Sequence, residues 1–223
     1  MNDHRLDLAR ERLAALPSGG LWWPARGLLC VSDLHLGKSE RIARRGGPML
    51  PPYEVEDTLR RLEADVAALA PRAVIALGDS FDDMAAEAGL NPAHRARIEA
   101  LVTGRDWCWI AGNHDPAPLS LGGRGTQVLR IGPIAFRHEA AAGAPEEPAE
   151  ISGHFHPKAC LSVRGRRVSR PCFLRDERRL ILPAYGTYTG GLASRDPALA
   201  GLMAPAARAI LTGSPMVEIP MPR

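Results

Sequence analysis

The feature that most constrains the fold of this 223-residue chain is a set of short apolar runs that each end at a polar loop. Apolar runs of this length, bounded by turn residues and free of polar alternation, are typical of strands buried on both faces. The runs are Leu28–Ser32, Ala73–Leu77 and Trp107–Ala111, and the loops after them begin at Asp33, Gly78 and Gly112. The sequence therefore predicts three buried strands.

Helical patterns separate these strands. Residues 54–70 repeat apolar side chains at helical spacing, after Pro51-Pro52 and just before Pro71. Asn91-Pro92 begins a second helix, and Gly104 ends it. Strands that alternate with helices indicate βαβ units with parallel pairing, so we expect an α/β fold.

Beyond residue 120 the pattern changes to short strands separated by glycine and proline turns. We expect a loop at residues 140–150 and strands at residues 127–131, 134–137, 159–163, 180–182, 209–211 and 216–219. No long linker or internal repeat divides the chain. We therefore interpret residues 1–223 as a single domain.

The N-terminal segment is charged and periodic, which favours a helical stretch around His4 and is unlike a secretory signal. The sequence has no run of 18 apolar residues, so we expect no membrane-spanning helix and no membrane partner. The formal net charge is only +3, which by itself does not select a partner. From these features we expect a cytoplasmic protein.

Polar side chains of metal-ligand type follow each predicted strand. They lie in four motifs, Asp33-Leu34-His35, Gly78-Asp79, Gly112-Asn113-His114-Asp115 and Gly153-His154-Phe155-His156. Because ligands bind outside the carboxyl ends of strands in open α/β sheets, we expect these loops to converge on one crevice. Carboxylate, amide and imidazole groups suit hard or borderline divalent ions. Two such ions can share a carboxylate, and Asp79 is the natural bridge because it stands alone on the middle strand.

The motifs DLH, GD, GNHD and GHFH, with His138 between the last two, resemble the signature of calcineurin-like metallophosphoesterases. The resemblance spans residues 31–156 and implies a four-layer α/β sandwich, with two mixed β-sheets flanked by helices. It implies that one divalent ion is held by Asp33, His35, Asp79 and His156. It implies that a second ion is held by Asp79, Asn113, His138 and His154.

His114 and His138 differ from the other histidines of this set, because each of them has an alternative interpretation. His114 matches the family's non-ligand histidine, which contacts the phosphate and helps the leaving oxygen depart; its alternative is an ordinary helix-start histidine. Asp115, Asp82 and Asp83 are each candidates to orient its ring. His138 ends the run IAFRH and is the only histidine between His114 and His154, although a surface histidine at a strand end is the alternative.

Two further stretches narrow the resemblance to one group. DLHLGK followed by Arg41, and LPAYGTYTGGL at residues 182–192, resemble the bacterial ligase-associated DNA damage response endonucleases, the PdeM-type group. This resemblance implies a manganese-dependent DNA phosphodiesterase, so we expect two Mn²⁺ ions as cofactors. It also implies DNA as substrate, a role in DNA repair, and a DNA ligase and a helicase encoded nearby as partners. We expect single-stranded DNA to be cut internally more readily than duplex, because a flexible strand can bend a phosphate into a recessed site.

Basic residues after the first motif agree with a nucleic-acid substrate. Lys38, Arg41 and Arg45 are spaced i, i+3, i+7, so on a helix they form one basic stripe that begins at the metal ligands. The alternative is an ordinary solvated face. Aromatic residues make up only 5% of the chain, which argues against a long base-stacking platform. We therefore expect contact mainly with the phosphate backbone.

Other functions stay open at this point. A nucleotide-lipid pyrophosphatase of the same superfamily is resembled locally by GDSFDD at residues 78–83, but it needs an apolar lid and no long amphipathic insertion is present. A small-molecule phosphatase uses the same metal ligands. A non-catalytic metal-binding scaffold belongs to a different class and requires a degraded site, whereas every ligand of the signature is present here.

Overall fold

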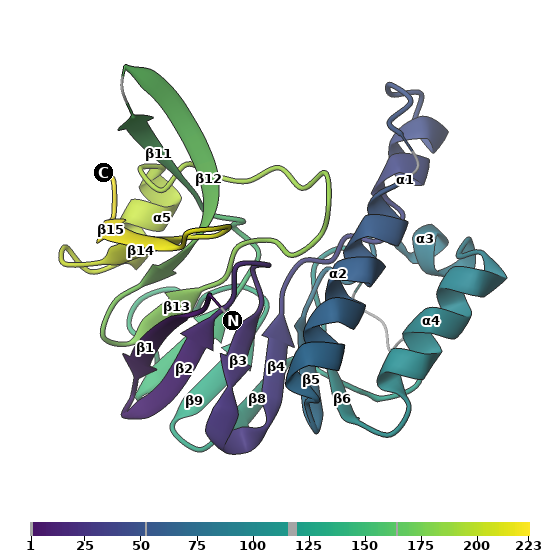
Figure 1. Ribbon diagram of the computed structural model, residues 1–223, viewed down its shortest axis with the longest axis horizontal. Coiled ribbons are helices and arrows are strands. Elements are labelled where there is room, and N and C mark those ends of the chain that lie inside the picture. Colours follow the sequence, from purple (N-terminus) through teal and green to yellow (C-terminus); the bar gives the residue numbers. More distant parts are fainter. Residues whose placement is uncertain (1, 52, 116–119, 164) are drawn as a thin grey trace.

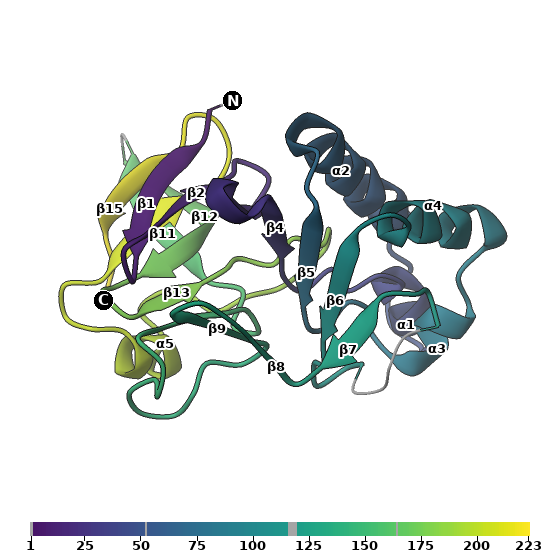
Figure 2. The same cartoon turned by 90° about the horizontal axis from the view of Figure 1, so that it is seen from below.

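The computed structural model describes residues 2–51, 53–115, 120–163 and 165–223. Two mixed β-sheets pack face to face, with helices on the outer face of each (Figures 1 and 2). This arrangement confirms the predicted fold class. Among the described residues, no helix combines the length and hydropathy needed to cross a bilayer.

The first sheet is built on the three buried strands expected from the sequence. In the described part of the chain its order is β1 (His4–Leu8), β2 (Glu11–Ala15), β3 (Leu21–Trp23), β4 (Leu28–Val31), β5 (Ala73–Leu77), β6 (Asp106–Ile110) and β7 (Arg124–Thr126). The strands from β1 to β4 pair antiparallel, and those from β4 to β7 pair parallel. A short 3-10 helix, η1 (Pro24–Arg26), joins β3 to β4.

Helices α2 (Glu54–Leu69) and α4 (Pro92–Val102) cover the outer face of this sheet (Figure 2). Three acidic residues in the first turn of α2 complement the positive end of the helix dipole. The Asn91 side chain accepts a hydrogen bond from the His94 amide and caps α4. Two shorter helices, α1 (Lys38–Arg44) and α3 (Met84–Ala88), follow β4 and β5.

The second sheet contains the strand-rich second half of the chain. Its described order is β15 (Val217–Pro220), β14 (Arg208–Leu211), β12 (Arg166–Arg175), β13 (Arg179–Ile181), β10 (Ala149–Ser152), β9 (Ile134–Arg137) and β8 (Val128–Ile131). The strand β11 (Lys158–Val163) pairs with β12, and this hairpin projects from the sandwich (Figure 1). The helix α5 (Pro197–Leu202) packs Leu199 on the outer face of the sheet. Strands β9, β10 and β13 are parallel neighbours, so this sheet is mixed as well.

The predicted helical stretch around His4 is wrong, because these residues form the hairpin of β1 and β2. Ala9 and Arg10 both have positive φ, at 49° and 68°, and make the tight turn between the strands. Leu6 and Leu8 alternate with polar residues and point into the core, a period of two that local helix propensity obscured. Strands β10 and β12 were also not expected from the sequence.

The space between the two sheets is filled by large apolar side chains from both of them. Trp23 of β3 and Phe136 of β9 stack with ring centroids 6.4 Å apart and an interplanar angle of 27°. Trp23 is 1% exposed and Phe136 is fully buried. Side chains that join the sheets in this way fix the distance between the loops at their carboxyl ends.

Replacing Phe136 tests how far the sandwich depends on this contact. Because Phe136→Ala leaves a cavity between the sheets, we expect the free energy of unfolding to fall by about 3–5 kcal/mol in urea titrations. The matched truncation Val217→Ala, at an exposed position on the edge strand β15, should change it by less than about 0.5 kcal/mol. Equal effects of the two substitutions would contradict this account of the core.

Candidate metal centre and active site

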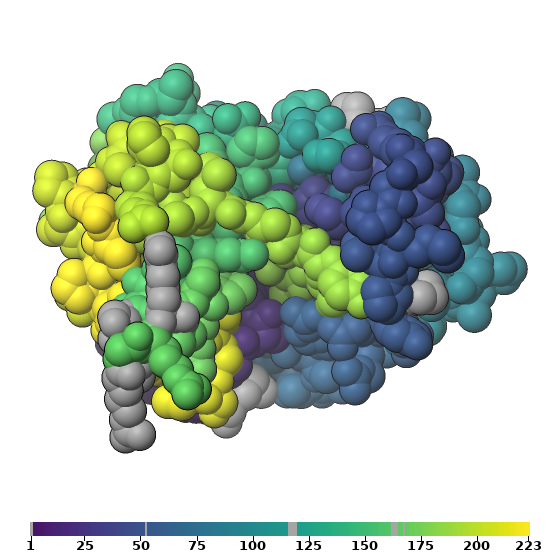
Figure 3. All heavy atoms as spheres, turned by 90° about the horizontal axis from the view of Figure 1, so that it is seen from above, coloured from purple at the N-terminus to yellow at the C-terminus, as the bar shows by residue number. Residues whose placement is uncertain are grey.

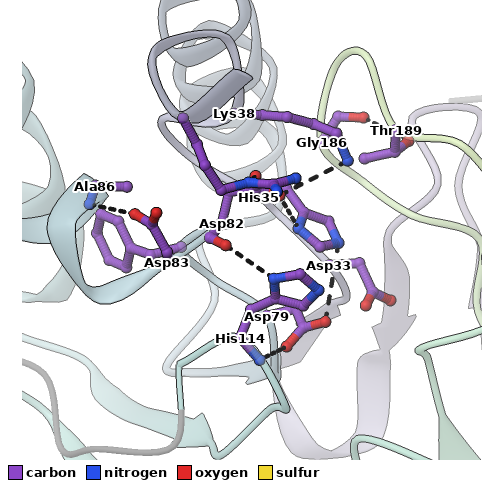
Figure 4. A network of polar contacts seen from close by, with 12 residues as sticks. Asp33, His35, Lys38, Asp79, Asp82, Asp83, Ala86, His114, Gly186 and Thr189 are labelled. Carbon is purple, nitrogen blue, oxygen red and sulfur yellow. Dashed lines mark hydrogen bonds and ion pairs between the residues drawn. The ribbon is translucent and has the colours of Figure 1, made fainter. Parts of the chain in front are cut away.

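The four motif loops meet at one end of the sandwich. Asp33 and His35 follow β4, Asp79 follows β5, and His114 follows β6 of the first sheet (Figure 4). The second sheet contributes His138 after β9, and His154 and His156 after β10. Since β4 to β6 are parallel, as are β9 and β10, their carboxyl ends bring these side chains to the same region.

One group of potential ligands consists of Asp33, His35 and His156. The Nε2 atoms of His35 and His156 lie 3.3 Å apart, and His156 Nε2 is 3.1 Å from Asp33 Oδ1. Asp33 is fully buried and His35 is 3% exposed. Their ligand atoms therefore face a common point that is largely shielded from solvent.

A second group consists of Asp79, His138 and His154. His138 Nε2 lies 3.3 Å from Asp79 Oδ2 and 3.1 Å from His154 Nδ1. Asn113 joins this group, because its Oδ1 is 2.9 Å from His138 Nε2 and 3.1 Å from His154 Nδ1. The structure thus brings the amide oxygen of the GNHD motif to the same point as two imidazoles and a carboxylate.

Asp79 lies between the two groups. Its Oδ2 is 3.3 Å from His138 Nε2 in one group and 3.9 Å from His35 Nε2 in the other. Its Oδ1 accepts a hydrogen bond of 2.9 Å from the His114 amide, which fixes the orientation of the carboxylate. This is the position expected of a bridging ligand.

The donor set fits divalent cations. Asp33 Oδ1 is buried without a well-aligned hydrogen bond, its near contact being His156 Nε2 at 3.1 Å, and a buried carboxylate oxygen needs a compensating charge or donor. His138 Nδ1 faces the Leu77 carbonyl at 2.9 Å, and a carbonyl only accepts, so this nitrogen carries the proton and leaves Nε2 free as a ligand. Second contacts of this kind are characteristic of metal-binding histidines.

Close packing at this site requires glycine beside the candidate ligands. A β-carbon on Gly153 would collide with Ser32 Oγ and Asp33 Oδ2, and one on Gly112 would collide with Asp79 Oδ1. The absent side chains leave room for a ligand from the neighbouring loop. Glycine therefore allows two loops from different strands to approach within ligand distance.

The charges of the site favour a cation. Burial would raise the pKa of Asp79, but contacts with His138 and the His114 amide outweigh it and lower the pKa to about 2. Burial opposes ionisation of Asp33 too, yet His156, His138 and Ser32 hold its pKa below the usual value. Conversely, burial disfavours a charge on His138, but the Asp79 and Asp33 carboxylates overcome it and raise its pKa to about 9. Two ionised carboxylates thus attract positive charge to this point.

His114 lies beside the first group without joining either ligand set. Its Nδ1 is 2.8 Å from the backbone carbonyl of Asp82, so this nitrogen carries the proton. Its ring packs edge to face on His35, with centroids 5.3 Å apart. The group that orients His114 is therefore a backbone carbonyl, whereas the sequence suggested a carboxylate of Asp82, Asp83 or Asp115.

The three acidic candidates have other contacts. Asp82 Oδ1 is 2.8 Å from His35 Nδ1, so its side chain orients a potential ligand. Asp83 accepts from the Ala86 amide and caps α3. Asp115 accepts from the Ser80 and Phe81 amides, and burial, aided by the charge of Asp79, raises its pKa to about 6. The sequence marked Asp82 through the GDSFDD stretch but did not connect it with His35.

The predicted basic stripe forms a helix, but two of its charges are engaged. Arg41 Nε donates to Asp82 Oδ2, and Lys38 Nζ lies 3.7 Å from Asp82 Oδ1. Arg45 caps the end of α1 and is exposed, with no ion pair inside the described ranges. Two cations therefore face the Asp82 carboxylate beside His35.

Residues 182–192 form a segment that we call the late loop, and hydrogen bonds from this loop support the first motif. The amides of Tyr185 and Gly186 donate to the carbonyls of Ser32 and Asp33 at 2.7 and 3.0 Å. Thr187 Oγ1 donates to Asp57 Oδ2 of α2 at 2.7 Å. The sequence singled out this stretch as a family motif but gave no indication that it connects α2 with the ligand loops.

Comparison with known proteins places this geometry in a family context. A family model described as calcineurin-like phosphoesterase matches residues 27–171, which include every ligand predicted from the sequence. The crystal structure of Pseudomonas putida nuclease MPE is similar, with a TM-score of 0.73, 27% sequence identity, and coverage of 97% of this chain and 100% of that chain. Yfce, a phosphoesterase from E. coli, has a TM-score of 0.42 and 12% identity, covering 87% of this chain and 99% of that chain. No curated protein matches the chain.

The raised pKa of His138 predicts a pH-dependent stability. The pKa of His138 in the folded protein is about 9, above the usual 6.5. The protonated ring therefore contributes to the free energy of unfolding below pH 6.5, and this contribution is lost as pH rises through 9. In chelator, the free energy of unfolding should fall between those values by as much as about 3 kcal/mol. The His138→Gln variant should lack this loss, and saturating divalent ions should suppress it. A wild-type profile that stays flat in chelator would contradict the prediction.

Proposed function

The chain belongs to the calcineurin-like phosphoesterase family, and from this premise we propose that it is a dinuclear, manganese-dependent phosphodiesterase that cuts nucleic acid. Its substrate is single-stranded DNA, which it cuts internally during DNA repair. The observation that carries the proposal is the pair of ligand groups on either side of Asp79, with His114 next to them.

Each ion has its own set of chain residues in this proposal. Asp33, His35 and His156 would hold one ion, Asn113, His138 and His154 would hold the other, and Asp79 would serve both. When bound, the ions neutralise charge on the phosphoryl group and acidify the attacking water. The buried carboxylates fix the spacing of the ligands, because Asp33 and Asp79 are held by hydrogen bonds from backbone amides of His154 and His114.

His114 acts on the leaving group. Its Nδ1 proton is committed to the Asp82 carbonyl, so Nε2 is the atom that contacts the substrate. A protonated Nε2 donates its proton to the departing alkoxide, which is general acid catalysis. The edge-to-face packing on His35 keeps the ring next to the ligands.

Three features favour a phosphodiester of nucleic acid. The similar protein from Pseudomonas putida is itself a nuclease. Lys38 and Arg41 place two cations beside the first ligand group, and Arg45 follows them at the exposed end of α1. A cavity of about 300 Å³, bordered by Asn113, His138 and Arg137, opens beside the second ligand group and gives room for a flanking nucleotide.

The substrate is tested by direct comparison. With Mn²⁺ the protein should cleave single-stranded DNA internally and a small phosphodiester reporter, and should act more slowly on a phosphomonoester and on intact duplex. Excess EDTA should stop all turnover. Elemental analysis should find two metal ions per wild-type chain and fewer in the Asp79→Ala variant. This variant should not cleave DNA. Preference for the monoester would favour a small-molecule phosphatase, and turnover in EDTA would contradict the metal mechanism.

Replacing His114 separates chemistry from metal binding. His114→Ala should keep both ions while lowering kcat by about 10²–10⁴-fold, because general acid–base assistance typically has that size. The loss should be smaller for a diester with a highly acidic leaving group, which departs without a proton. Loss of metal in this variant would instead make His114 a ligand.

A further inference from the structure

In the described part of the chain two aromatic side chains are exposed, and both belong to segments that adjoin the loops of the candidate metal centre. Tyr53 is 66% exposed and Tyr188 is 39% exposed, whereas the other nine aromatic side chains are buried or half-buried. Tyr53 directly precedes α2, and Tyr188 belongs to the late loop. Isolated exposed apolar residues need no explanation, but a pair at one site does.

A short chain of contacts joins the two tyrosines. The Asp57 amide donates to the Tyr53 carbonyl at 2.8 Å, so Tyr53 is one helical turn before Asp57. The Asp57 carboxylate accepts from Thr187 Oγ1 at 2.7 Å, and Tyr188 is the next residue. Tyr53 and Tyr188 therefore border the same part of the surface, although they are far apart in sequence.

The late loop places Tyr188 beside the ligands. Gly186 and Thr189, on either side of it, lie next to Lys38 and His35 (Figure 4). In the space-filling view the yellow-green late loop reaches across to the dark-blue segment that contains α1 (Figure 3). The Thr189 carbonyl accepts from Lys158 Nζ at 3.3 Å, which anchors the far side of the loop tip.

The backbone of Tyr188 is strained. Its φ of 62° is in the left-handed region, which costs a bulky residue about 1–2 kcal/mol. Thr189 Oγ1 donates to the Gly186 carbonyl at 3.0 Å and closes the turn that holds this conformation. Strain of this kind persists where the surroundings enforce it, and it is concentrated at sites that act on ligands. A turn alone would be made more easily by glycine or asparagine.

The surroundings of the pair suit a nucleic-acid strand. The groups near Tyr188 include the cations Lys38 and Lys158 and the Thr187 hydroxyl, and the acidic first turn of α2 follows Tyr53, so the surroundings are polar and unlike the apolar centre of a protein interface. Cations beside an aromatic ring bind the phosphates while the ring stacks on a base, and stacking contributes about 1–3 kcal/mol per base. Bases in intact duplex are paired and stacked on one another, so they are not available to the rings.

We propose that Tyr188, aided by Tyr53, stacks on unpaired nucleobases next to the scissile phosphate and so selects single-stranded nucleic acid. This inference rests on the proposed nuclease function and names the group that makes the site prefer an unpaired strand. Stacking on the faces of bases gives little sequence preference, so the tyrosines select strandedness rather than sequence.

The test uses variants that remove the ring without disturbing the backbone. Tyr188→Asn tolerates the left-handed conformation, and Tyr188→Phe keeps the ring while removing the hydroxyl. With single-stranded DNA and Mn²⁺, Tyr188→Asn should raise KM about 10-fold, within the range that stacking energies imply, whereas Tyr188→Phe should match wild type. Tyr53→Ala should raise KM in the same direction. Val217→Ala, at an exposed position on β15, is the matched control and should have no effect.

A second substrate shows whether the lost contact is with a base. An oligonucleotide with abasic sites flanking the cleaved bond should be a weaker substrate for wild type by a similar factor. The Tyr188→Asn variant should lose nothing further on that substrate, because the two changes remove the same contact. Its preference for single strands over duplex should also diminish. Bound Mn²⁺, measured in every variant, checks that the site is intact.

The outcomes separate the two proposals. If wild type cuts single-stranded DNA and Tyr188→Asn has the same KM and strand preference, the stacking role is overturned while the nuclease function stands. If the loss caused by the abasic sites and the loss caused by Tyr188→Asn are fully additive, Tyr188 does not contact the removed bases and the inference also fails. Absence of DNA cleavage by wild type would overturn the nuclease function itself.

Discussion

The structure depends on a group of candidate metal ligands held in an unfavourable backbone conformation. Asp33, His35, Asp79, His154 and His156 all have positive φ, between 44° and 68°. For residues other than glycine this conformation costs roughly 1–3 kcal/mol each, so the rest of the fold must enforce it. This backbone conformation is needed for geometric reasons, because a sharp reversal at a strand end turns successive side chains toward one point.

The loops enforce this conformation on one another. The His35 amide donates to the Asp79 carbonyl at 2.9 Å, and the His154 amide donates to Asp33 Oδ2 at 3.0 Å. The first contact joins loops of the same sheet, and the second joins the two sheets. Packing of Trp23 on Phe136 between the sheets keeps these contacts in register. The sandwich therefore serves as the frame that allows ligands from both sheets to meet.

The late loop, which directly follows β13 of the second sheet, adds a third support. Its amides donate to the carbonyls of Ser32 and Asp33, and its Thr187 binds α2. A β-carbon on Gly186 would collide with the Leu34 carbonyl, so only glycine allows the loop to lie this close. One segment thus both braces the ligands and presents Tyr188 at their edge.

The sequence was sufficient for the parallel core and for the motifs that meet there. Apolar runs followed by Asp33, Asp79 and Asn113 identify buried strands, because burial on both faces leaves no polar alternation. The carboxyl ends of parallel strands lie at one edge of a sheet, so the loops that follow them meet there. It was not sufficient for the N-terminal hairpin. Residues 4–15 are rich in Arg, Leu and Ala, which favour helix locally, and the pairing that overrides this preference joins residues across the turn.

Contacts between distant segments were the other part that the sequence did not reveal. Low aromatic content argued against a long base-stacking platform, but composition does not reveal that Tyr53 and Tyr188 are exposed. Likewise, the spacing of Lys38, Arg41 and Arg45 predicted a stripe but not the carboxylate that two of them contact. Such pairings depend on where separate loops lie in space, which periodicity does not encode.

The contact of α1 with Asp82 explains why a basic helix directly follows the first ligand pair. Asp82 is fully buried, and burial would raise its pKa, but His35, Arg41 and Lys38 outweigh that effect and lower it. An ionised Asp82 accepts only, so it keeps the proton of His35 on Nδ1 and leaves Nε2 directed at His156 and Asp79. The helix is itself held by buried Glu54 of α2, which accepts from the Ser39 amide at 3.0 Å. The two basic residues therefore have two effects at once. They stabilise the carboxylate that orients His35, and they place two cations beside the candidate metal centre, where the proposed function needs groups that bind phosphate.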